Sequence, residues 1–357
     1  MRRSSGFIIL CVWSLSGWSI AAEPAASPVT LVRSSKSGAW SDTATWDGGQ
    51  VPGHGVKVQV RPGHTVTYDV QAPESVVIRS LFVAGTVSFA TDKSTQLNVG
   101  LIKIEATDST DEEGFDCDMH LEASDPNAPR ASLLVGTPNQ PVTANAKALI
   151  RLAYVPGMNK ESCPAIVCCA GRMDFHGAPL NRSWVKLGAT ASKGAKEVTL
   201  AEPVTGWKVG DRIIVTATLP GERKAGTTEP RTIIALDGTM LSFDEPLEYE
   251  HLADGEFRGE VANLSRNVIV ESADPDGERG HTMYHRYSAG SIGHTEFRHL
   301  GKKGVLGRYS LHFHLVGSTM RGSSVIGASI WDSHNRWLTI HGTNHLVVRD
   351  CVGFRSI

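Results

Sequence analysis

The sequence predicts an all-β protein that ends in the first coils of a right-handed parallel β-helix. Short runs of alternating apolar and polar residues, such as residues 56–60 and 65–69, follow one another between turn residues. The 36 glycines and 17 prolines are scattered along the 357 residues, as in a turn-dense β protein. Near the end, residues 323–330 align with residues 345–352, one coil length later.

The first segment, residues 1–22, has the features of a secretory signal peptide. Arg2 and Arg3 precede an apolar stretch that ends in small residues. We therefore expect a secreted chain, extracellular or periplasmic, with no stable membrane span after cleavage; an N-terminal membrane anchor is the alternative. The Ala- and Pro-rich residues 23–35 are expected to form a linker.

Three β blocks are expected after the linker. Residues 36–152 contain short strands without a helical face and predict a sandwich-like domain. Residues 171–255 repeat this pattern around turns such as Asp237–Gly238 and predict a second, small β block. Residues 265–357 predict β-helix coils, which bury their apolar side only by stacking. The sequence stops in mid-pattern without a capping segment, so we expect a truncated β-helix.

Composition narrows the class of partner and the role of the cysteines. A formal charge of -2 and a pI near 6.7 argue against nucleic acid as a partner. Five cysteines remain after the signal peptide, an odd number, and their spacing matches no recognised zinc motif. One disulfide and buried free thiols both remain open for Cys117, Cys163, Cys168, Cys169 and Cys351.

Several short motifs follow one another along the chain: residues 38–46, 51–53, 56–60, 62–63, 66–69, 172–177, 184–187, 206–213, 309–314 and 340–344. In this order they resemble one known family, the eight-glycine (G8) domain followed by a right-handed β-helix. The family includes fibrocystin, the cell-migration-inducing hyaluronan-binding protein and the transmembrane cell-surface hyaluronidase, and the chain is most similar to secreted bacterial members.

The resemblance implies an exported protein with a polysaccharide partner, hyaluronan-like in the named members. It also implies a glycoside hydrolase of hyaluronidase type as the candidate activity. Family members continue through further coils with a His- and acid-containing segment. Any role that lies in that segment is missing here, so this chain by itself is expected to be an incomplete enzyme.

A histidine strip is the first candidate site. In residues 311–315 (LHFHL), alternation directs the apolar side chains inward and His312 and His314 outward, side by side. Residues 338–341 repeat the pattern, so stacked coils would place His341 over His314. Three imidazoles on one strip suit a divalent metal, the one cofactor class the sequence suggests. Contact with substrate and a purely structural role are the alternatives.

A polar turn between two tryptophans is the second candidate site. A pyranose face stacks on an indole ring while its hydroxyl groups pair with charged side chains, so such a turn suits a sugar groove. The alternative for its basic residues is that they are solvated surface side chains without a role in sugar binding. The predicted substrate-binding residues are Arg308, Trp331, His334, Arg336 and Trp337.

Asp332 and Asp350 are the candidate catalytic residues of the last coils. Glycosidases use two carboxyl groups about 5–9.5 Å apart, and these two are the available pair. The alternative is that each aspartate binds the backbone of its own turn. The sequence has no Gly-rich phosphate loop, serine nucleophile elbow or HExxH motif.

The function predicted is therefore that of a secreted carbohydrate-active protein that binds, and as an enzyme depolymerises, an anionic polysaccharide. A non-catalytic extracellular carbohydrate-binding or adhesion module is the alternative.

Overall fold

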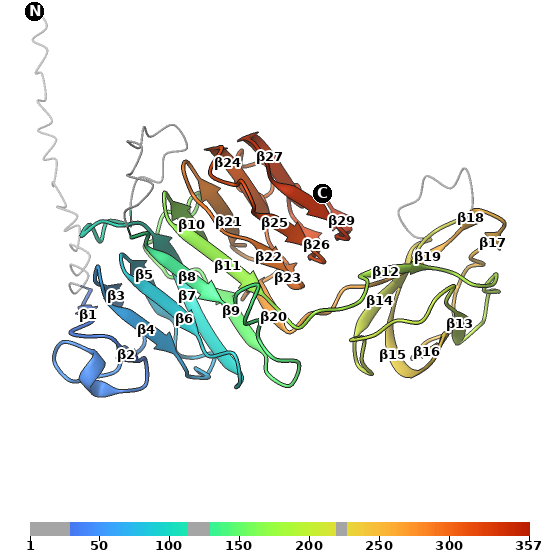
Figure 1. Ribbon diagram of the computed structural model, residues 1–357, viewed down its shortest axis with the longest axis horizontal. Coiled ribbons are helices and arrows are strands. Elements are labelled where there is room, and N and C mark those ends of the chain that lie inside the picture. The colour runs from blue at the N-terminus through green and yellow to red at the C-terminus, as the bar shows by residue number, and fades with distance from the viewer. Residues whose placement is uncertain (1–28, 113–128, 219–226) are drawn as a thin grey trace, which may run out of the picture.

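The computed structural model describes residues 29–112, 129–218 and 227–357, and its strands form a parallel β-helix with an inserted antiparallel domain (Figure 1). The predicted signal peptide and residues 23–28 of the predicted linker lie outside the described residues, whereas residues 31–33 of that linker form the first strand. The helical content of the described part is one 3-10 turn, η1 (Thr43–Thr45). No helix there is long or apolar enough to span a bilayer.

The β-helix has three faces; each coil adds one strand to faces 1 and 2, and every coil after the first two also adds one to face 3. Face 1 contains β1 (Leu31–Arg33), β3 (Lys57–Val60), β5 (Ile78–Val83), the second half of β7 (Thr95–Ile104), β10 (Ala165–Cys169), β21 (His281–His285), β24 (Leu311–Gly317) and β27 (Leu338–Thr343). Face 2 contains β2 (Gly38–Ala39), β4 (Thr65–Tyr68), β6 (Thr86–Phe89), β8 (Ser132–Val135), β11 (Arg172–His176), β22 (Ile292–Gly293), β25 (Ser324–Ile326) and β28 (Val347–Arg349). Face 3 contains the first half of β7, β9 (Ala148–Leu152), β20 (Val268–Ser272), β23 (Thr295–Arg298), β26 (Ser329–Ser333) and β29 (Val352–Ser356).

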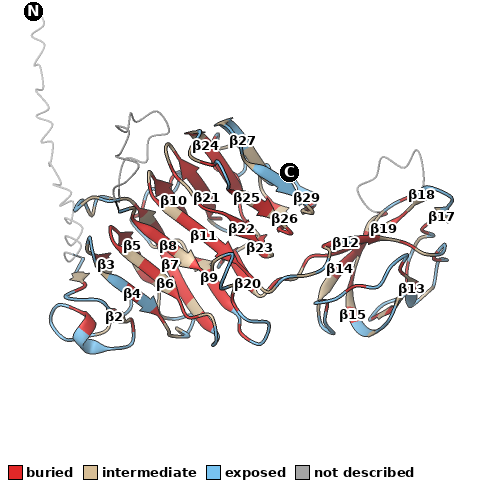
Figure 2. Ribbon diagram, in the orientation of Figure 1, coloured by how far each residue is buried: buried red, intermediate tan, exposed pale blue. Residues whose placement is uncertain are grey.

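Alternate residues of these strands point inward and form one continuous core. It begins at Trp40 and Trp46, whose rings meet edge to face at 4.8 Å, and extends to Ile330. The buried residues follow the coils through the middle of the β-helix, whereas β27 and β28 at its end are intermediate or exposed (Figure 2). This stacking of apolar rows confirms the all-β class and the β-helix predicted from the sequence.

The arrangement of the first block differs from the sandwich expected for residues 36–152. Its strands pair in parallel and form the first coils of the same β-helix, which β7 links to the later coils through β9 and β10. The physical reason is that period-two alternation marks a strand with one buried side in either architecture. Alternation alone therefore cannot identify the pairing partner.

The second block is an antiparallel domain inserted between β11 and β20 (Figure 1). It has its own core, which includes Leu200, Trp207 and Phe243. Its strands are β12 (Trp184–Lys186), β13 (Glu197–Thr199), β14 (Arg212–Val215), β15 (Glu229–Asp237), β16 (Met240–Phe243), β17 (Ala253–Asp254), β18 (Phe257–Arg258) and β19 (Glu260–Asn263).

The inserted domain packs against face 3 of the β-helix. Ile214, Ala262 and Leu264 form one buried cluster with Trp331 and its face 3 neighbours. The cysteines of the described residues carry free thiols; Cys117 lies outside the described part. These thiols belong to Cys163, Cys168, Cys169 and Cys351.

Candidate functional site: a histidine strip on face 1

Histidines of three neighbouring coils line up on the outer side of face 1. Leu311 and Phe313 of β24 enter the core, so His312 and His314 project to the opposite side. The strand register pairs His314 with His285 on one side and with His341 on the other. The stacking that the repeat predicted for His341 and His314 is therefore present.

The imidazole rings of the strip are close enough to share a ligand. Nδ1 of His341 lies 3.2 Å from Nδ1 of His314, and the rings of His312 and His314 are centred 4.8 Å apart. One ligand atom from each of His312, His314 and His341 lies within 4.8 Å of the other two. The ring of His285 stacks on His314 at 5.5 Å with an interplanar angle of 11°.

His312 and His314 are more deeply buried than an outward position on a strand suggests, with 2% and 8% of their surfaces exposed. The residues just before β24 fold over the strip. There, the ring of Tyr309 meets His312 edge to face at 4.7 Å, and the carbonyl of Gly307 lies 3.0 Å from Nδ1 of His312. The strip is therefore a partly enclosed site.

The environment of His312 leaves one ring nitrogen available as a ligand. The pKa of His312 is lowered to about 4, mainly by burial, and its neighbours His314 and His341 contribute in the same direction. The ring is therefore neutral at neutral pH, and Nδ1–H donates to the Gly307 carbonyl. Nε2 is buried without a hydrogen-bond partner among the described residues. A histidine held through a backbone carbonyl in this way is the usual form of a metal ligand.

The distances fit a metal ion after a small movement of one ring. Zinc–nitrogen bonds of about 2.0–2.1 Å place tetrahedral ligand atoms roughly 3.3 Å apart. The 3.2 Å between His314 and His341 meets this requirement. The widest spacing in the group, up to 4.8 Å, requires one imidazole to turn inward. An all-imidazole donor set suits zinc, copper or nickel, whereas calcium prefers oxygen ligands.

Trp331 does not take the part in a sugar groove that the sequence suggested. It is 6% exposed, packs between face 3 and the inserted domain, and carries the Arg212 guanidinium 4.9 Å over its ring. Its indole Nε1–H donates to Glu296 at 3.0 Å. Because both the ring and the N–H are engaged inside the protein, this indole is not a platform for a sugar.

The other predicted sugar contacts are split between two places. Trp337 is 37% exposed, and Arg336 lies 5.2 Å over the ring of Tyr309, beside the histidine strip. His334 lines a separate cleft, and Arg308 is 9% exposed and donates to the carbonyl of Glu161. The cleft has a volume of about 270 Å³ and is mainly basic, with Lys160, Arg279, Lys302 and Lys303 in its lining.

Asp332 and Asp350 are engaged in separate structural contacts. Asp332 accepts from His299 at 2.6 Å and from Arg279 at 3.0 Å. Burial by itself raises the pKa of Asp332, but these two partners lower it overall. Both carboxylate oxygens of Asp350 accept from the backbone N–H of Ser183, at 3.2 and 3.1 Å.

The two aspartates also lie too far apart to act as a glycosidase pair. Ser329 pairs with Val352 of the next coil, so two residues earlier Gly327 lies opposite Asp350. Gly327 is five residues before Asp332 in the chain. At about 3.3 Å per residue this is roughly 16 Å along the face, outside the 5–9.5 Å range of glycosidases.

The sequence analysis missed three contributors to the histidine strip: His285, Tyr309 and the Gly307 carbonyl. His285 belongs to the strip, and residues 281–285 (HTMYH) carry the same alternation as residues 311–315, so the pattern could have found it. Tyr309 and the Gly307 carbonyl cover the strip from a loop that has no such pattern.

Two family models match parts of the chain. Residues 45–188 match the family model of the G8 domain, and residues 278–357 match that of the CEMIP beta-helix. With the parallel coils, these matches support a chain that combines a G8 domain with the start of a β-helix. The bacterial origin and the secretion expected from the sequence stay predictions.

The relatives are much longer proteins. Fibrocystin-L of Homo sapiens is 28% identical over 366 residues, covering 87% of this chain and 8% of that protein. Fibrocystin-L of Mus musculus is 29% identical over 365 residues with the same coverage. A G8 domain-containing protein of Dictyostelium discoideum is 31% identical over 191 residues, covering 53% of this chain and 17% of the relative. The chain thus spans less than a fifth of these relatives.

Two solved tailspikes align only weakly with this chain. The tailspike gp61 of Pseudomonas phage phi297 aligns with a TM-score of 0.24 at 12% identity, over 84% of this chain and 39% of that one. The gp54 tailspike of Acinetobacter baumannii bacteriophage AP22, solved with a capsular saccharide, also gives a TM-score of 0.24, at 8% identity, over 76% and 41% of the two chains. Similarity this low has no bearing on function.

Proposed function

We propose that this chain is an extracellular carbohydrate-binding protein that binds an anionic polysaccharide, hyaluronan-like in character, at the histidine strip of face 1. In this proposal His312, His314 and His341 hold a divalent metal ion. The observation that carries the proposal is the cluster of three imidazoles from neighbouring coils, in which one buried ring nitrogen has no hydrogen-bond partner in the described part of the chain.

Neutral ligands make such a centre attractive to a polyanion. Three uncharged imidazoles leave the full charge of a divalent ion uncompensated, and a fourth position remains for an oxygen ligand. Trp337 and Arg336 lie on the same last coils and supply an exposed ring and a cation for a sugar chain. The carboxylates of a uronate polymer provide the matching charge and oxygen donors.

The residues of this chain would prepare the site in two ways. The Gly307 carbonyl fixes the tautomer of His312, and the stacked ring of His285 restricts the rotation of His314. A bound metal would supply polarisation of a coordinated water or sugar oxygen. If the protein is an enzyme, the reaction proposed for this site is depolymerisation of the bound polysaccharide.

A non-catalytic binding or adhesion module is the second candidate. It is favoured by the separation of Asp332 and Asp350, because both residues already have structural partners and neither is paired for hydrolysis. Binding without a change in polymer length would select this candidate.

The test combines metal analysis with polymer binding. The protein is equilibrated with zinc, dialysed, analysed for bound metal and titrated with hyaluronan, chondroitin sulfate and pectate. We expect about one metal ion per chain, and polymer binding that weakens in the presence of a chelator. His314→Ala should lose the metal, whereas His345→Ala, a nearby histidine bonded to Arg321, should keep it.

Equal metal content in both variants would reject the histidine strip as the metal site. Polymer binding that is unaffected by chelator and by His314→Ala would reject its role in polysaccharide recognition. Sizing of the polymers after incubation separates the two candidate functions.

A further inference from the structure

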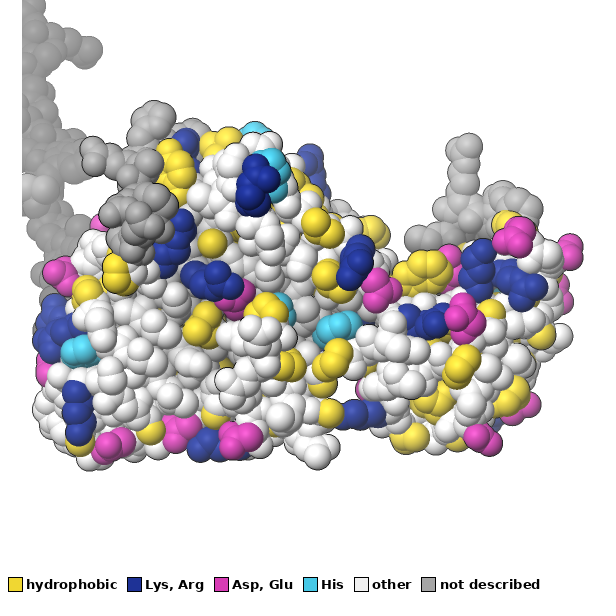
Figure 3. All heavy atoms as spheres, viewed as in Figure 1, with side chains coloured by type: hydrophobic (Ala, Val, Ile, Leu, Met, Phe, Trp, Pro, Cys, Tyr) yellow, Lys and Arg dark blue, Asp and Glu magenta, His cyan; other side chains and the backbone are white. Residues whose placement is uncertain are grey.

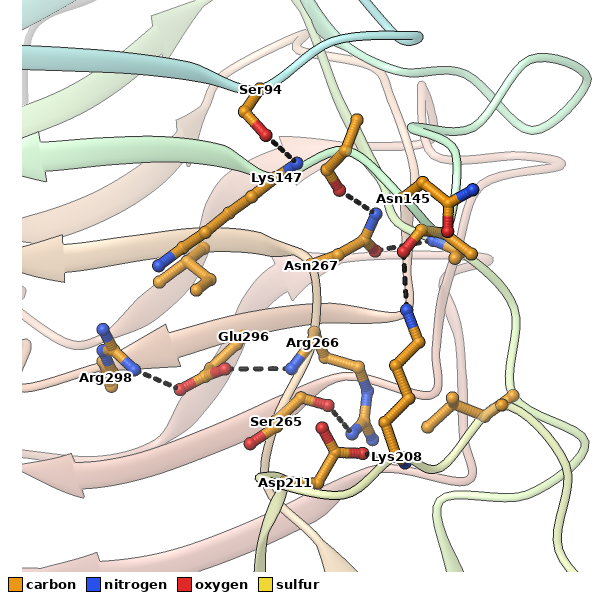
Figure 4. Close-up of a pocket in the computed structure, with 16 residues that line it drawn as sticks. Ser94, Asn145, Lys147, Lys208, Asp211, Ser265, Arg266, Asn267, Glu296 and Arg298 are labelled. Carbon is orange, nitrogen blue, oxygen red and sulfur yellow. Dashed lines mark hydrogen bonds and ion pairs between the residues drawn. The ribbon is translucent and has the colours of Figure 1, made fainter. Parts of the chain in front are cut away.

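A second cleft lies where the inserted domain meets face 3 of the β-helix. Figure 3 shows the surface hollowed between these two parts of the molecule. The cleft has a volume of about 370 Å³. One wall comes from residues at the starts of β9 and β20 and from β23, and the other from the turn at residues 206–211 of the inserted domain (Figure 4).

Two lysines of this cleft have no carboxylate partner among the residues that the structure describes. Lys147 is exposed, its side chain extends along the cleft (Figure 4), and its ammonium group makes no hydrogen bond or ion pair with the described residues. Lys208 donates from Nζ to the carbonyl of Ala144 at 2.5 Å, which holds the ammonium in place without neutralising it. The amide of Asn145, two residues before Lys147 and also in the lining, makes no hydrogen bond with the described residues either.

The other charged side chains of the cleft are held by hydrogen bonds or ion pairs within the protein. Arg298 is balanced by Glu271 at 2.7 Å and Glu296 at 3.1 Å. Arg266 is buried and bonded to backbone carbonyls and to the Ser183 hydroxyl rather than to a carboxylate. Burial lowers the pKa of Arg266 to about 10, so it stays charged at neutral pH. Burial also raises the pKa of Asp211, which favours its neutral form.

The cleft is therefore positive. Since Glu271 and Glu296 balance Arg298, the positive character of the cleft comes from Lys147, Lys208 and Arg266, which face one further carboxyl group, that of Asp211. Most of the other lining groups are polar or small, and the volume equals roughly twelve water molecules at about 30 Å³ each. A compact, hydroxylated anion fits this lining better than an apolar ligand, which would leave the ammonium groups desolvated and unpaired.

We propose that this cleft binds a carboxylate-bearing sugar unit, with the carboxylate at Lys147 and the hydroxyl groups toward Asn145 and Lys208. The ligand class rests on the proposed function, but the residues differ from the histidine strip and need no metal. The unit belongs either to a polymer or to a free uronic acid, since both offer the same carboxylate.

The test titrates the whole chain with sodium glucuronate, with glucose as the neutral ring of the same size, and with a hyaluronan oligosaccharide. We expect glucuronate to bind and glucose to bind far more weakly. Lys147→Gln should weaken glucuronate binding about tenfold, since one charge-assisted contact is lost. Lys147→Arg should retain most of the affinity. The control Lys36→Gln removes the same charge from an exposed site far along the β-helix and should change affinity less than about twofold.

Equal binding of glucose and glucuronate, or equal losses in Lys147→Gln and Lys36→Gln, would overturn the proposal. A loss of glucuronate binding in His314→Ala or on addition of chelator would also overturn it, because the anion would then bind at the histidine strip. If only the oligosaccharide, or only the monosaccharide, responds to Lys147→Gln, the cleft is supported and the source of its ligand is identified.

Discussion

At the scale of single residues, burial decides which histidines can carry a proton. His294 turns the chain from face 2 to face 3, and its Nδ1 accepts from the backbone N–H of Leu180 at 3.4 Å. Burial lowers the pKa of His294 to about 4, and the nearby charge of Arg266 acts in the same direction. The ring is therefore held neutral in the folded protein.

This pKa predicts a loss of stability on acidification. Above pH 6.5 the ring is neutral in both the folded and the unfolded chain, so His294 adds no pH dependence. Between pH 6.5 and about 4 the unfolded chain takes up the proton and the folded chain does not, so the free energy of unfolding decreases as the pH is lowered through this range. We expect about 1–2 kcal/mol from this residue, because the ring is partly exposed and solvent screens the effect.

Denaturant titrations at pH 7 and pH 4.5 measure the effect. His294→Asn keeps a side chain that tolerates a positive φ and accepts a hydrogen bond, but it does not titrate. The variant should therefore lose less stability than the natural chain over this pH range. Equal losses would show that His294 is protonated equally in the folded and unfolded states.

At the scale of elements, the corners of the coils require an unusual backbone. His294, Gly327 and Asp350 occupy the same corner in three successive coils, with φ values of 47°, 66° and 51°. Histidine and aspartate are among the few residues other than glycine that adopt this left-handed conformation readily. The corner thus explains these residues structurally, although the carboxylate of Asp350 accepts from the backbone N–H of Ser183 rather than from its own turn as considered from the sequence.

Gly327→Ala should lower the free energy of unfolding by more than the backbone strain of a positive φ accounts for. A Cβ atom at Gly327 would lie 2.5 Å from Nδ1 of His294, which is itself hydrogen-bonded. Gly304→Ala is the control, because Gly304 has a φ of 75° and nothing within 4 Å of an added Cβ. We expect about 1–2 kcal/mol for the control and about 1–3 kcal/mol more for Gly327→Ala, measured by denaturant unfolding. Similar values for the two variants would mean that His294 moves aside without cost.

At the scale of the whole molecule, the inserted domain covers the part of face 3 that carries Trp331 and Phe354. This contact converts two parts of different architecture into one structure and creates the positive cleft between them. It also removes Trp331 from the surface, so the exposed aromatic ring at the end of the coils is Trp337.

The two tryptophans should therefore respond differently to truncation. Trp331→Ala should lower the free energy of unfolding by about 3–5 kcal/mol and expose the connections at residues 177–183 and 264–267 to limited proteolysis. Trp337→Ala should cost about 1 kcal/mol or less but weaken polysaccharide binding. A stable Trp331→Ala variant with reduced polymer binding would reverse these assignments.

The sequence by itself determined the strands, the side of each strand that faces the core, and the register of residues 338–341 on residues 311–314. These properties depend on local alternation and on the length of one coil, both of which can be found along a single chain. The tertiary structure decided that the first block joins the β-helix, that a loop encloses His312, and that Trp331 is buried. It also decided the distance between Asp332 and Asp350. Each of these depends on contacts between residues far apart in sequence, and alternation carries no information about which distant strand or loop will supply the contact.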